Sequence, residues 1–480
     1  MAQPTLPAHA MPLSELLAGD TSAADAGLQR SAVSISGLQL DSRKVITGDA
    51  FIAMSGESAD GRNYIRSAVE AGAAAIVAES GLNEVQRAAA AGLPLVEIAR
   101  LPARLGELAG RFYGAPSQAM HLVGVTGTNG KTTTSRLLAQ LLRGNYGQCG
   151  VVGTLGATLG NEAQDALNTT PDAISLQRQL AQWSGAAVEH AVLEVSSHAL
   201  VQGRVNGLAF DSAIFTNLSH DHLDYHGDMQ RYGEAKSLLF QNAALSSAIV
   251  NRDDPYAAQL LPRSGVDVLD YSLTDSAASV YASDIHFRRD GLEARIETPW
   301  GSGHLHSSLA GDFNLSNLLA ALTAACIAEI PLADALEMAP GLHSVAGRMQ
   351  TVGNDLGLQL VVDYAHTPDA LQQALQALRA HVEGQLICVF GCGGDRDANK
   401  RPVMGSVVDR WADRAIVTSD NPRGESPRLI IDDIVAGIDG SCDVEPDRAR
   451  AIALAVQAAQ PGDCVLVAGK GHESYQQVGE

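Results

Sequence analysis

Short apolar runs followed by polar or glycine-rich loops recur along most of this 480-residue chain. After residue 100, HLVGV leads into TGTNGKTT, HAVLEV into SSHAL, SAIF into TNLSHDHLDYH and SAIV into NRDDPYA. Runs of this length, rich in β-branched residues and alternating with helical segments, indicate βαβ units around a parallel sheet. We therefore predict an α/β protein whose informative polar residues lie at the carboxyl ends of its strands, where open sheets bind ligands.

The pattern changes twice along the chain, which predicts three domains. Residues 1–99 alternate short apolar runs with turns, whereas residues 100–344 follow the strand, loop and helix pattern. The same pattern restarts in residues 345–480, where LVVDY leads into AHTPDAL, LICVF into GCGGDRD, AIVT into SDNPR and CVLVA into GKGHES. We expect a doubly wound parallel sheet in the central region and a second α/β domain at the C-terminus.

The stretch GVTGTNGKTTTSRLLAQLL, residues 124–142, predicts a phosphate-binding loop between a strand and a helix. Glycines let backbone N–H groups surround phosphate oxygens, and the helix N-terminus adds partial positive charge. Lys131 would reach the β- and γ-phosphates, and the Thr132 hydroxyl would bind Mg²⁺. A strict Walker A motif has glycine where this chain has Val125, so the loop is a variant. A glycine-rich turn without nucleotide is the alternative, but the strand, G-K-T and helix together favour ATP. The predicted nucleotide-binding residues here are Gly127, Thr128, Asn129, Gly130, Lys131, Thr132 and Thr133.

Two further segments suggest a divalent metal near this loop. Glu194 lies near the end of the HAVLEV strand, where a buried carboxylate needs a partner such as Mg²⁺. The segment NLSHDHLDYHGD is rich in histidine and aspartate, but its spacing fits no zinc signature, and a solvated loop is its simpler interpretation. Lys236 follows on a helix, and a lysine beside a metal would need a neighbouring anion or a chemical change.

Composition narrows the classes of partner. Lys and Arg number 33 against 54 Asp and Glu, a formal charge of −21, which argues against nucleic acid as the main partner. No apolar run has the length of a membrane span, and the first residues lack the pattern of a signal peptide. The six cysteines show no zinc-type spacing. We expect a cytoplasmic protein without a membrane span, and a monomer.

The stretch TSDNPRGESP, residues 418–427, raises the question of what Arg423 holds. Pro422 fixes its own φ and restricts Asn421, so a rigid turn presents the arginine. Its planar guanidinium suits a carboxylate or a phosphate. Taken alone, the segment is more often an ordinary surface turn with a solvated arginine.

The order of several motifs resembles that of the Mur ligases, the ATP-dependent amide-forming enzymes of peptidoglycan precursor synthesis. The motifs are TGTNGKTT, LEVSSH, NLSHDHLDYH, DFNLSN, GRM, DYAHTP and DNPR, and the resemblance covers nearly the whole chain. It implies an N-terminal UDP-binding domain, a central ATPase and a C-terminal Rossmann-like domain. Within the family the chain is similar to members that add meso-diaminopimelate to UDP-N-acetylmuramoyl-L-alanyl-D-glutamate through an acyl phosphate, with Mg²⁺.

The resemblance also implies site residues. For the UDP-muramoyl-dipeptide they are Leu40, Ser42, Glu57, Ser58, Ala59, Asn168, Thr169, Thr170, Ser196, Gln202 and Arg204. Asn314 and Arg348 match nucleotide contacts. His222 matches a histidine at a second metal, and Lys236 matches a lysine that the family carries as an N-carboxylated residue. The implied catalytic set is Lys131, Glu194, His222 and Lys236. The implied metal ligands are Thr132, Glu194, His222 and Lys236. For diaminopimelate they are Arg396, Asp420, Asn421, Pro422, Arg423, Gly469 and Glu473.

In this resemblance Arg423 would bind the distal carboxylate of diaminopimelate, which L-lysine lacks. Two features depart from the family pattern. Gln350 stands where glutamate is usual, which removes any role of that carboxylate. The chain ends at QQVGE, where relatives continue, which would either leave the third domain less stable or mark a trimmed sequence.

Four alternative functions each account for only part of the sequence. A lysine-adding ligase disagrees with DNPR, and an enzyme similar to folylpolyglutamate synthetase disagrees with the long region before the phosphate loop. A regulatory P-loop protein would bind nucleotide without forming a bond. A purely structural role would not explain so many polar residues at strand ends.

Overall fold

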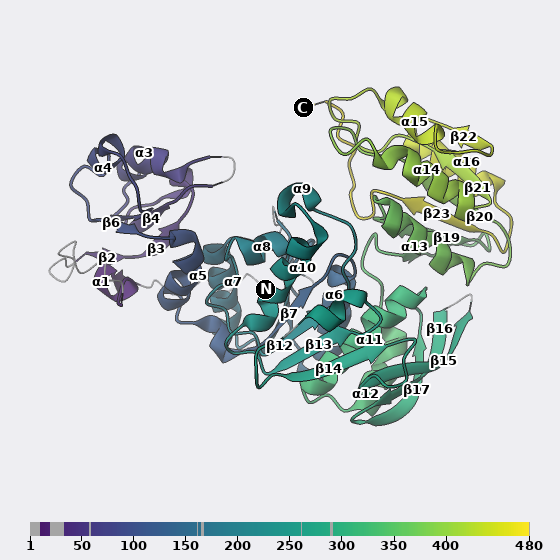
Figure 1. Ribbon diagram of the computed structural model, residues 1–480, viewed down its shortest axis with the longest axis horizontal. Helices are drawn as coiled ribbons and strands as arrows, with labels where there is room; N and C mark the ends of the chain where they lie inside the picture. The colour runs from purple at the N-terminus through teal and green to yellow at the C-terminus, as the bar shows by residue number, and fades with distance from the viewer. Residues whose placement is uncertain are drawn as a thin grey trace.

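The computed structural model describes residues 10–19, 33–56, 59–160, 162–164, 168–260, 262–288 and 291–479. These residues form a mixed α/β structure with a four-stranded, an eleven-stranded and a six-stranded sheet, besides one two-stranded pair. Each large sheet belongs to one domain, and the N- and C-terminal domains lie at opposite ends of the central one (Figure 1). The predicted α/β class is confirmed.

The N-terminal domain is built on a parallel sheet in the order β3-β4-β5-β6. Its strands are apolar because both faces are covered, and all five residues of β4 are buried. The elements of this domain are β1 (Met11–Pro12), α1 (Leu13–Leu16), β2 (Ser34–Ile35), β3 (Gly37–Gln39), β4 (Asp49–Ala53), α3 (Ile65–Glu70), β5 (Ala75–Glu79), α4 (Glu84–Ala88) and β6 (Leu95–Ile98). Helix α5 (Leu101–Phe112) follows and packs on α7 of the central domain.

The central sheet is doubly wound around parallel strands in the order β8-β11-β7-β12-β13-β14-β15. Val123 and Val125 of β7 pack on one side with Leu137 and Leu138 of α6, whereas Leu122 faces the opposite side with α7. The parallel strands are β7 (His121–Thr126), β8 (Gly150–Gly153), β11 (His190–Glu194), β12 (Ser212–Phe215), β13 (Ser247–Asn251), β14 (Asp267–Ser272) and β15 (Val280–Arg288). The helices are α6 (Lys131–Tyr146), α7 (Ala173–Gly185), α8 (Ser197–Val201), α9 (Leu223–His226), α10 (Met229–Ser237), α11 (Asp312–Ile327) and α12 (Leu332–Met338).

The sequence analysis did not predict the antiparallel strands that extend this parallel core at both edges. Antiparallel strands extend it through β9 (Gly156–Leu159) and β10 (Glu162–Gln164) on one side. On the other side β16 (Gly291–Thr298) pairs antiparallel with β15, and β17 (Gly301–Ser307) pairs antiparallel with β16. Burial alternates along β15 and β16, as expected of strands with one solvated face. Such strands carry a weaker apolar signal than buried parallel strands.

The C-terminal domain repeats the doubly wound arrangement in the order β18-β19-β23-β20-β21-β22, with only β18 antiparallel. Its strands are β18 (Gln350–Val352), β19 (Gln359–Asp363), β20 (Leu386–Phe390), β21 (Arg414–Val417), β22 (Cys442–Val444) and β23 (Cys464–Ala468). Its helices are α13 (Pro368–Arg379), α14 (Lys400–Trp411), α15 (Pro427–Val435) and α16 (Arg448–Ala458). The strands that the sequence predicted here are therefore present.

A buried histidine joins the C-terminal domain to the central one. His381, just after α13, donates from Nδ1 to the carbonyl of Arg288 at 2.6 Å and accepts at Nε2 from the Gly311 N–H at 3.0 Å. Both partners are backbone groups of the central domain, and Gly311 directly precedes α11. The pair of bonds requires the neutral ring with its proton on Nδ1.

All six cysteines are free thiols, and Cys388 and Cys392 pack in the C-terminal core. Within the described ranges, no helix combines the length and apolar character needed to cross a bilayer.

Candidate active site

The phosphate loop joins β7 to α6 with backbone that only glycine allows. Gly130 has φ of +83°, and a Cβ there would lie 2.4 Å from the Asn317 side-chain oxygen. Lys131 opens the helix and folds back over the loop, donating from Nζ to the carbonyls of Gly127 at 2.8 Å and Thr128 at 2.9 Å. Desolvation lowers the pKa of Lys131, although Glu194 and Asp221 oppose this shift. The lysine is thus held at the mouth of the loop without a carboxylate bonded to it.

Glu194 ends β11 and is fully buried beside the loop. Its Oε2 accepts from the hydroxyls of Thr132 at 2.8 Å and Thr154 at 3.1 Å, and its Oε1 accepts from the Thr154 N–H at 3.1 Å. Gly153 leaves the necessary room, because a Cβ there would overlap the carboxylate. In the described structure the hydrogen bonds to this buried carboxylate come from hydroxyl and amide groups, and its hard oxygen atoms suit a divalent cation.

Lys236 on α10 lies under the same loop and is 1% exposed. Its Nζ donates to the Gly127 carbonyl at 2.8 Å and lies 4.3 Å from the centre of the Tyr232 ring. Desolvation, and then the charge of Lys131, hold the pKa of Lys236 well below its usual value. A lowered pKa increases the fraction of the amine that is neutral and therefore nucleophilic.

His222 stands in the left-handed region, with φ of +54°, at the start of α9. Its Nε2 lies 3.3 Å from Asp221, and desolvation lowers its pKa despite that carboxylate. The ring contacts His198 and Tyr232 edge-on. His222 therefore shares Tyr232 as a neighbour with Lys236.

A cleft of about 320 Å³ lies between the phosphate loop and the C-terminal domain. Of the residues predicted for nucleotide, metal and substrate, it is lined by Thr128, Asn129, Gly130, Lys131, Thr132, Thr133, Thr169, His222, Asn314 and Arg348. The sequence analysis did not single out Asn317, Asp363 and Tyr364, which also line it, although each falls within a quoted motif.

Arg348 and Gln350 lie in the segment that connects the two domains. The Arg348 guanidinium stacks 4.4 Å from the centre of the Tyr364 ring, and the Gln350 Oε1 accepts from the Gly347 N–H at 2.8 Å. Burial raises the pKa of Asp363, which accepts the N–H groups of Met349 and Ala365. Gln350 thus acts as a neutral acceptor that closes the turn, a task that a carboxylate would also perform.

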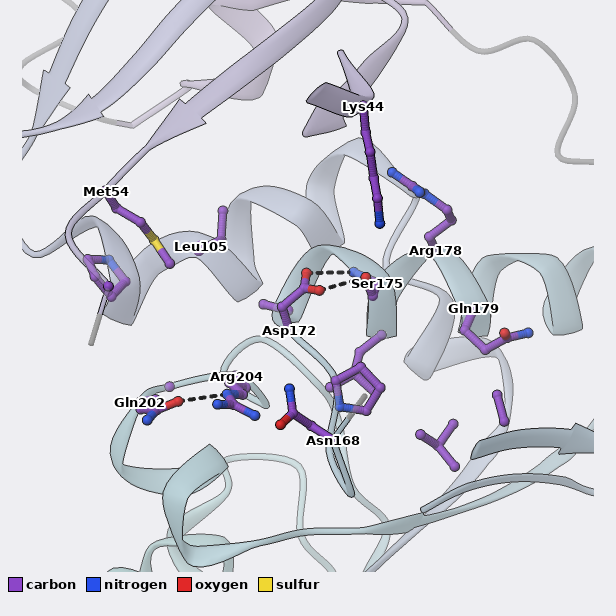
Figure 2. A pocket seen from close by; sticks show the side chains of 18 of the residues that line it. Lys44, Met54, Leu105, Asn168, Asp172, Ser175, Arg178, Gln179, Gln202 and Arg204 are labelled. Atoms are coloured by element: carbon purple, nitrogen blue, oxygen red, sulfur yellow. Dashed lines mark hydrogen bonds between the residues drawn. The ribbon is translucent and has the colours of Figure 1, made fainter. Parts of the chain in front are cut away.

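A second and larger cleft, of about 960 Å³, lies where the N-terminal and central domains meet. Figure 2 shows Lys44 and Met54 entering it from the N-terminal domain, opposite Asn168, Gln202 and Arg204. Arg204 donates to Gln202 at 2.7 Å and to the Thr170 carbonyl at 2.8 Å. The prediction for the muramoyl-dipeptide missed Lys44, Asp172 and Arg178, which also line this cleft.

Not every residue predicted for the UDP-linked substrate lines this cleft. Leu40 and Ser42 are adjacent in sequence to Lys44 but are not among its lining residues, and Ser42 is buried. Ala59 is exposed, with its carbonyl accepting from the Gly56 N–H. Glu57 and Ser58 fall outside the described residues.

The two clefts adjoin at residues 168–171. Asn168 and Pro171 line the larger cleft, whereas Thr169 lines the smaller one and contacts the Thr154 hydroxyl at 3.1 Å. The Thr170 hydroxyl donates to the Glu194 carbonyl at 2.8 Å and is bonded to Ser196, which caps α8. The segment therefore separates the clefts by a single layer of chain.

A third polar cluster forms at the ends of β20, β21 and β23. The Glu473 Oε2 accepts from Lys470 at 2.7 Å and from Asn421 at 2.9 Å. Burial opposes the ionisation of Glu473, but these two donors hold its pKa below the usual value. One oxygen of the buried Asp420 has no hydrogen-bond partner among the described residues, and a Cβ on Gly469 would lie 2.7 Å from it.

Arg423 has φ of +50°, a left-handed conformation that costs a non-glycine residue about 1 kcal/mol. Its side chain is half-buried and donates from Nη1 to the Gly394 carbonyl at 2.7 Å. Arg396, on the neighbouring loop, is exposed. The structure thus gathers Asn421, Arg423 and Glu473, with Arg396 at the rim.

The donor chemistry tests whether magnesium fits this site. Thr132 and Glu194 supply hard oxygen ligands beside the phosphate loop, which suits Mg²⁺. His222 and Lys236 do not complete a ligand set as they stand, because Lys236 is a donor. In the parts of the chain that the structure describes, no three His, Cys, Asp or Glu side chains are placed to hold a metal ion together.

Comparison with known proteins covers almost the whole chain. The family models for the Mur ligase catalytic domain, middle domain and glutamate ligase domain match residues 34–113, 125–325 and 347–471. The UDP-N-acetylmuramoyl-L-alanyl-D-glutamate--2,6-diaminopimelate ligase of Coxiella burnetii is 46% identical over 93% of each chain. The enzyme of the same name from Pseudomonas aeruginosa is 47% identical over 92% of this chain and 91% of its own.

Solved structures give the same picture. One of a UDP-N-acetylmuramoyl-L-alanyl-D-glutamate--2,6-diaminopimelate ligase has a TM-score of 0.71 at 40% identity, covering 92% of this chain and 91% of that one. Folylpolyglutamate synthase from Mycobacterium tuberculosis has a TM-score of 0.63 at 17% identity over 77% of this chain and 92% of that one, which shows a shared fold alone.

Proposed function

This chain belongs to the Mur ligase family, and we propose that it is the ATP-dependent ligase that joins meso-2,6-diaminopimelate to UDP-N-acetylmuramoyl-L-alanyl-D-glutamate. We assign UDP binding to residues 1–99, ATP binding to residues 100–344 and amino-acid binding to residues 345–480. The relatives named for this reaction are 46–47% identical to it over at least 92% of its length, which supports the assignment. We place the reaction in the cytoplasm, where ATP is available, and expect the enzyme to act as a monomer.

The adjoining clefts are the observation that carries this proposal. A muramoyl-dipeptide in the larger cleft can extend its terminal carboxylate past residues 168–171 toward Lys131 in the smaller cleft. The third cluster, with Glu473 and Arg423, lies beyond Tyr364, whose hydroxyl is 3.5 Å from Glu473. Nucleotide, acceptor acid and amino acid thus converge from three domains, as a three-substrate ligation requires.

The chemistry proceeds in two steps. The D-glutamyl carboxylate attacks the γ-phosphorus of ATP, so that an acyl phosphate forms and ADP leaves. The amine of diaminopimelate then attacks the acyl carbon, loses a proton and expels inorganic phosphate. Lys131 stabilises negative charge on the moving phosphoryl group, and the loop N–H groups orient it. Magnesium, held by Thr132 and Glu194, would neutralise further phosphate charge when bound.

Lys236 contributes through a covalent change. Its buried amine, with a lowered pKa, would react with carbon dioxide to give a carbamate and a proton. The carbamate turns a hydrogen-bond donor into an anion, which suits a second magnesium ion beside His222. Loss of activity in Lys236→Ala, restored in part by short carboxylic acids, is the expected result; full activity without any acid would remove Lys236 from the mechanism.

Arg423 supplies the selectivity. Diaminopimelate carries a distal carboxylate that L-lysine lacks, and a guanidinium without a carboxylate partner recognises it. Glu473 would bind the ammonium group at the same end of the amino acid.

The test is phosphate release with ATP, Mg²⁺ and UDP-N-acetylmuramoyl-L-alanyl-D-glutamate, with meso-diaminopimelate or L-lysine added in parallel. We expect release with diaminopimelate alone, and its loss at moderate diaminopimelate concentration in Arg423→Ala. Release with lysine instead would keep the ligase but overturn the selectivity. A regulatory P-loop protein would hydrolyse ATP equally in Arg423→Ala, without either amino acid.

A further inference from the structure

Residues 475–479, here called the C-terminal strap, run alongside the loop that carries Arg423. The Arg423 N–H donates to the Gln477 carbonyl at 3.1 Å, and the Gly479 N–H donates to the Arg423 carbonyl at 2.9 Å. The Gln477 N–H donates to the Asn421 Oδ1 at 2.8 Å, and the Gln476 side chain donates to the Asp420 carbonyl at 2.7 Å. The strap is therefore hydrogen-bonded to Asp420, Asn421 and Arg423, the three polar residues of the DNPR turn.

These bonds fix an arginine backbone that would not adopt its conformation unaided. Arg423 lies in the left-handed region, which is maintained only where surrounding contacts hold it. On the opposite side, Gly394 approaches so closely that a Cβ there would lie 2.0 Å from the Pro422 carbonyl oxygen. The arginine is held between the strap and the loop after β20.

The guanidinium is held by two neutral acceptors. Its Nη1 donates to the Gly394 carbonyl at 2.7 Å, and its Nε donates to the Gln477 Oε1 at 3.2 Å. Arginine has five N–H donors, so Nη2 and one hydrogen of Nη1 remain, and within the described residues Nη2 forms no hydrogen bond. This remaining edge is the one that binds a carboxylate in bidentate fashion.

The nearby carboxylates have other partners. Glu425 accepts from Arg401 with both oxygens, at 2.8 and 2.9 Å, and Asp395 accepts from the Gly424 N–H at 3.0 Å. Glu473 is bonded to Lys470 and Asn421. The only side chain bonded to the Arg423 guanidinium in the described structure is the uncharged amide of Gln477.

We propose that Gln477 determines selectivity for the amino-acid substrate: its neutral amide orients Arg423 by Nε and leaves the cation unneutralised for the distal carboxylate. This inference rests on the proposed function. Gln477 is a positioning residue, because it acts through Arg423. A glutamate at the same position would pair with the guanidinium, neutralise it and repel an incoming carboxylate.

The test compares Gln477→Glu, Gln477→Met and the unchanged chain in the full ligation reaction. We expect Gln477→Glu to raise KM for meso-diaminopimelate about tenfold or more, because a charged hydrogen bond is affected, with KM for ATP unchanged. Gln477→Met keeps the length of the side chain but loses the acceptor, and should raise the same KM about threefold. Gln385→Glu makes the same chemical change at an exposed position before β20, at the other end of the sheet, and should leave KM for meso-diaminopimelate and KM for ATP unchanged.

Each other outcome has a defined meaning. If the unchanged chain releases phosphate with diaminopimelate but Gln477→Glu stays within twofold of it, this inference fails and the proposed function stands. An equal rise in KM for ATP or for the UDP-linked substrate would also overturn it, since a general structural role would cause that. Should Gln477→Glu fail to fold, an unchanged KM in Gln477→Met overturns the inference by itself. Absence of diaminopimelate-dependent release in the unchanged chain overturns both.

Discussion

The phosphate loop and the amino-acid cluster bind their ligands with opposite designs. In the central domain, Lys131 and Thr132 are neighbours in one continuous motif, and Glu194 completes the site from an adjacent strand with full burial. In the C-terminal domain, Asn421 and Arg423 come from the loop after β21 and Glu473 from the loop after β23. Bonds across more than 20 residues join Asn421 to Glu473, and Arg423 to Gly394 and Gln477. The residues that contact the phosphoryl group therefore come mainly from one short motif, whereas the residues that select the amino acid come from distant segments. We expect selectivity for the amino acid to be the easier of the two properties to alter by substitution.

The largest expected effect concerns the phosphate loop. Lys131→Ala removes the cation that stabilises the moving phosphoryl group, and should lower kcat at least about 100-fold, in line with the loss of one transition-state donor. Single-turnover phosphate release measures it. Arg143→Ala, near the other end of α6, is the matched control and should keep kcat. A decrease below tenfold for Lys131→Ala would contradict the role given to this lysine.

The second effect tests whether the two regions are independent. His381→Ala leaves the Gly311 N–H and the Arg288 carbonyl without their buried partner, and should lower the free energy of unfolding by about 2–3 kcal/mol. Denaturant titration measures this change. Because these bonds join the central and C-terminal domains, we also expect KM for ATP and for diaminopimelate to rise; a loss of stability with both constants unchanged would show that the domains are independent. His343→Ala, an exposed histidine of the central domain, should do neither.

The third effect concerns the amino-acid cluster and is tested at Arg401, to which no substrate contact is assigned. Arg401 is 3% exposed and joins Glu425 to Asp433, which ties the DNPR loop to α15. Arg401→Met should release Glu425 and raise KM for diaminopimelate about tenfold, with KM for ATP unchanged. Arg410→Met, an exposed position on the same helix, is the control. Equal changes in both constants would show that the loop is not selectively supported.

The smallest effect concerns the end of the central sheet opposite both sites. Burial lowers the pKa of His121 and of His190, and His190 stacks on Tyr146 with 4.2 Å between ring centres. A histidine whose pKa is lower in the folded state binds fewer protons there than in the unfolded state. Stability is therefore complete above about pH 6.5 and falls as pH decreases below it, by about 1 kcal/mol per histidine near pH 5.5.

Denaturant titrations at pH 7.5 and pH 5.5 measure this loss. His190→Asn should reduce the difference between the two values, whereas His286→Asn, at an exposed position, should preserve it. An unchanged difference in His190→Asn would show that this histidine is not responsible.

The sequence predicted the elements whose signals are local. The predicted helix after the phosphate loop is present as α6, and its Leu137, Leu138, Leu141 and Leu142 are all buried. The apolar runs before the quoted motifs are strands of the central and C-terminal sheets. Glycines that only a tight loop requires, such as Gly130, marked the phosphate site. Those features depend on short stretches of chain, whose periodicity and turn residues are visible in the sequence.

Other features arise only from contacts between distant segments. Nothing in the residues around Gln477 or His381 predicts that one bonds Arg423 and the other bonds Gly311, 54 and 70 positions away. The antiparallel strands β16 and β17 were missed because they are half-exposed and have few apolar residues. Lys44 and Arg178 line the larger cleft only because two domains meet there.

Helix α11 makes the central and C-terminal domains thermodynamically dependent on each other. Its first two turns carry Asn314 and Asn317 into the nucleotide cleft, while Gly311 before them is bonded to His381 of the other domain. A nucleotide that favours one position of this helix end would favour one orientation of the C-terminal domain. Reciprocity then requires an amino acid that binds that orientation better to tighten nucleotide binding by the same factor. Nucleotide and amino-acid affinities are thus linked through a single helix end that contacts both domains.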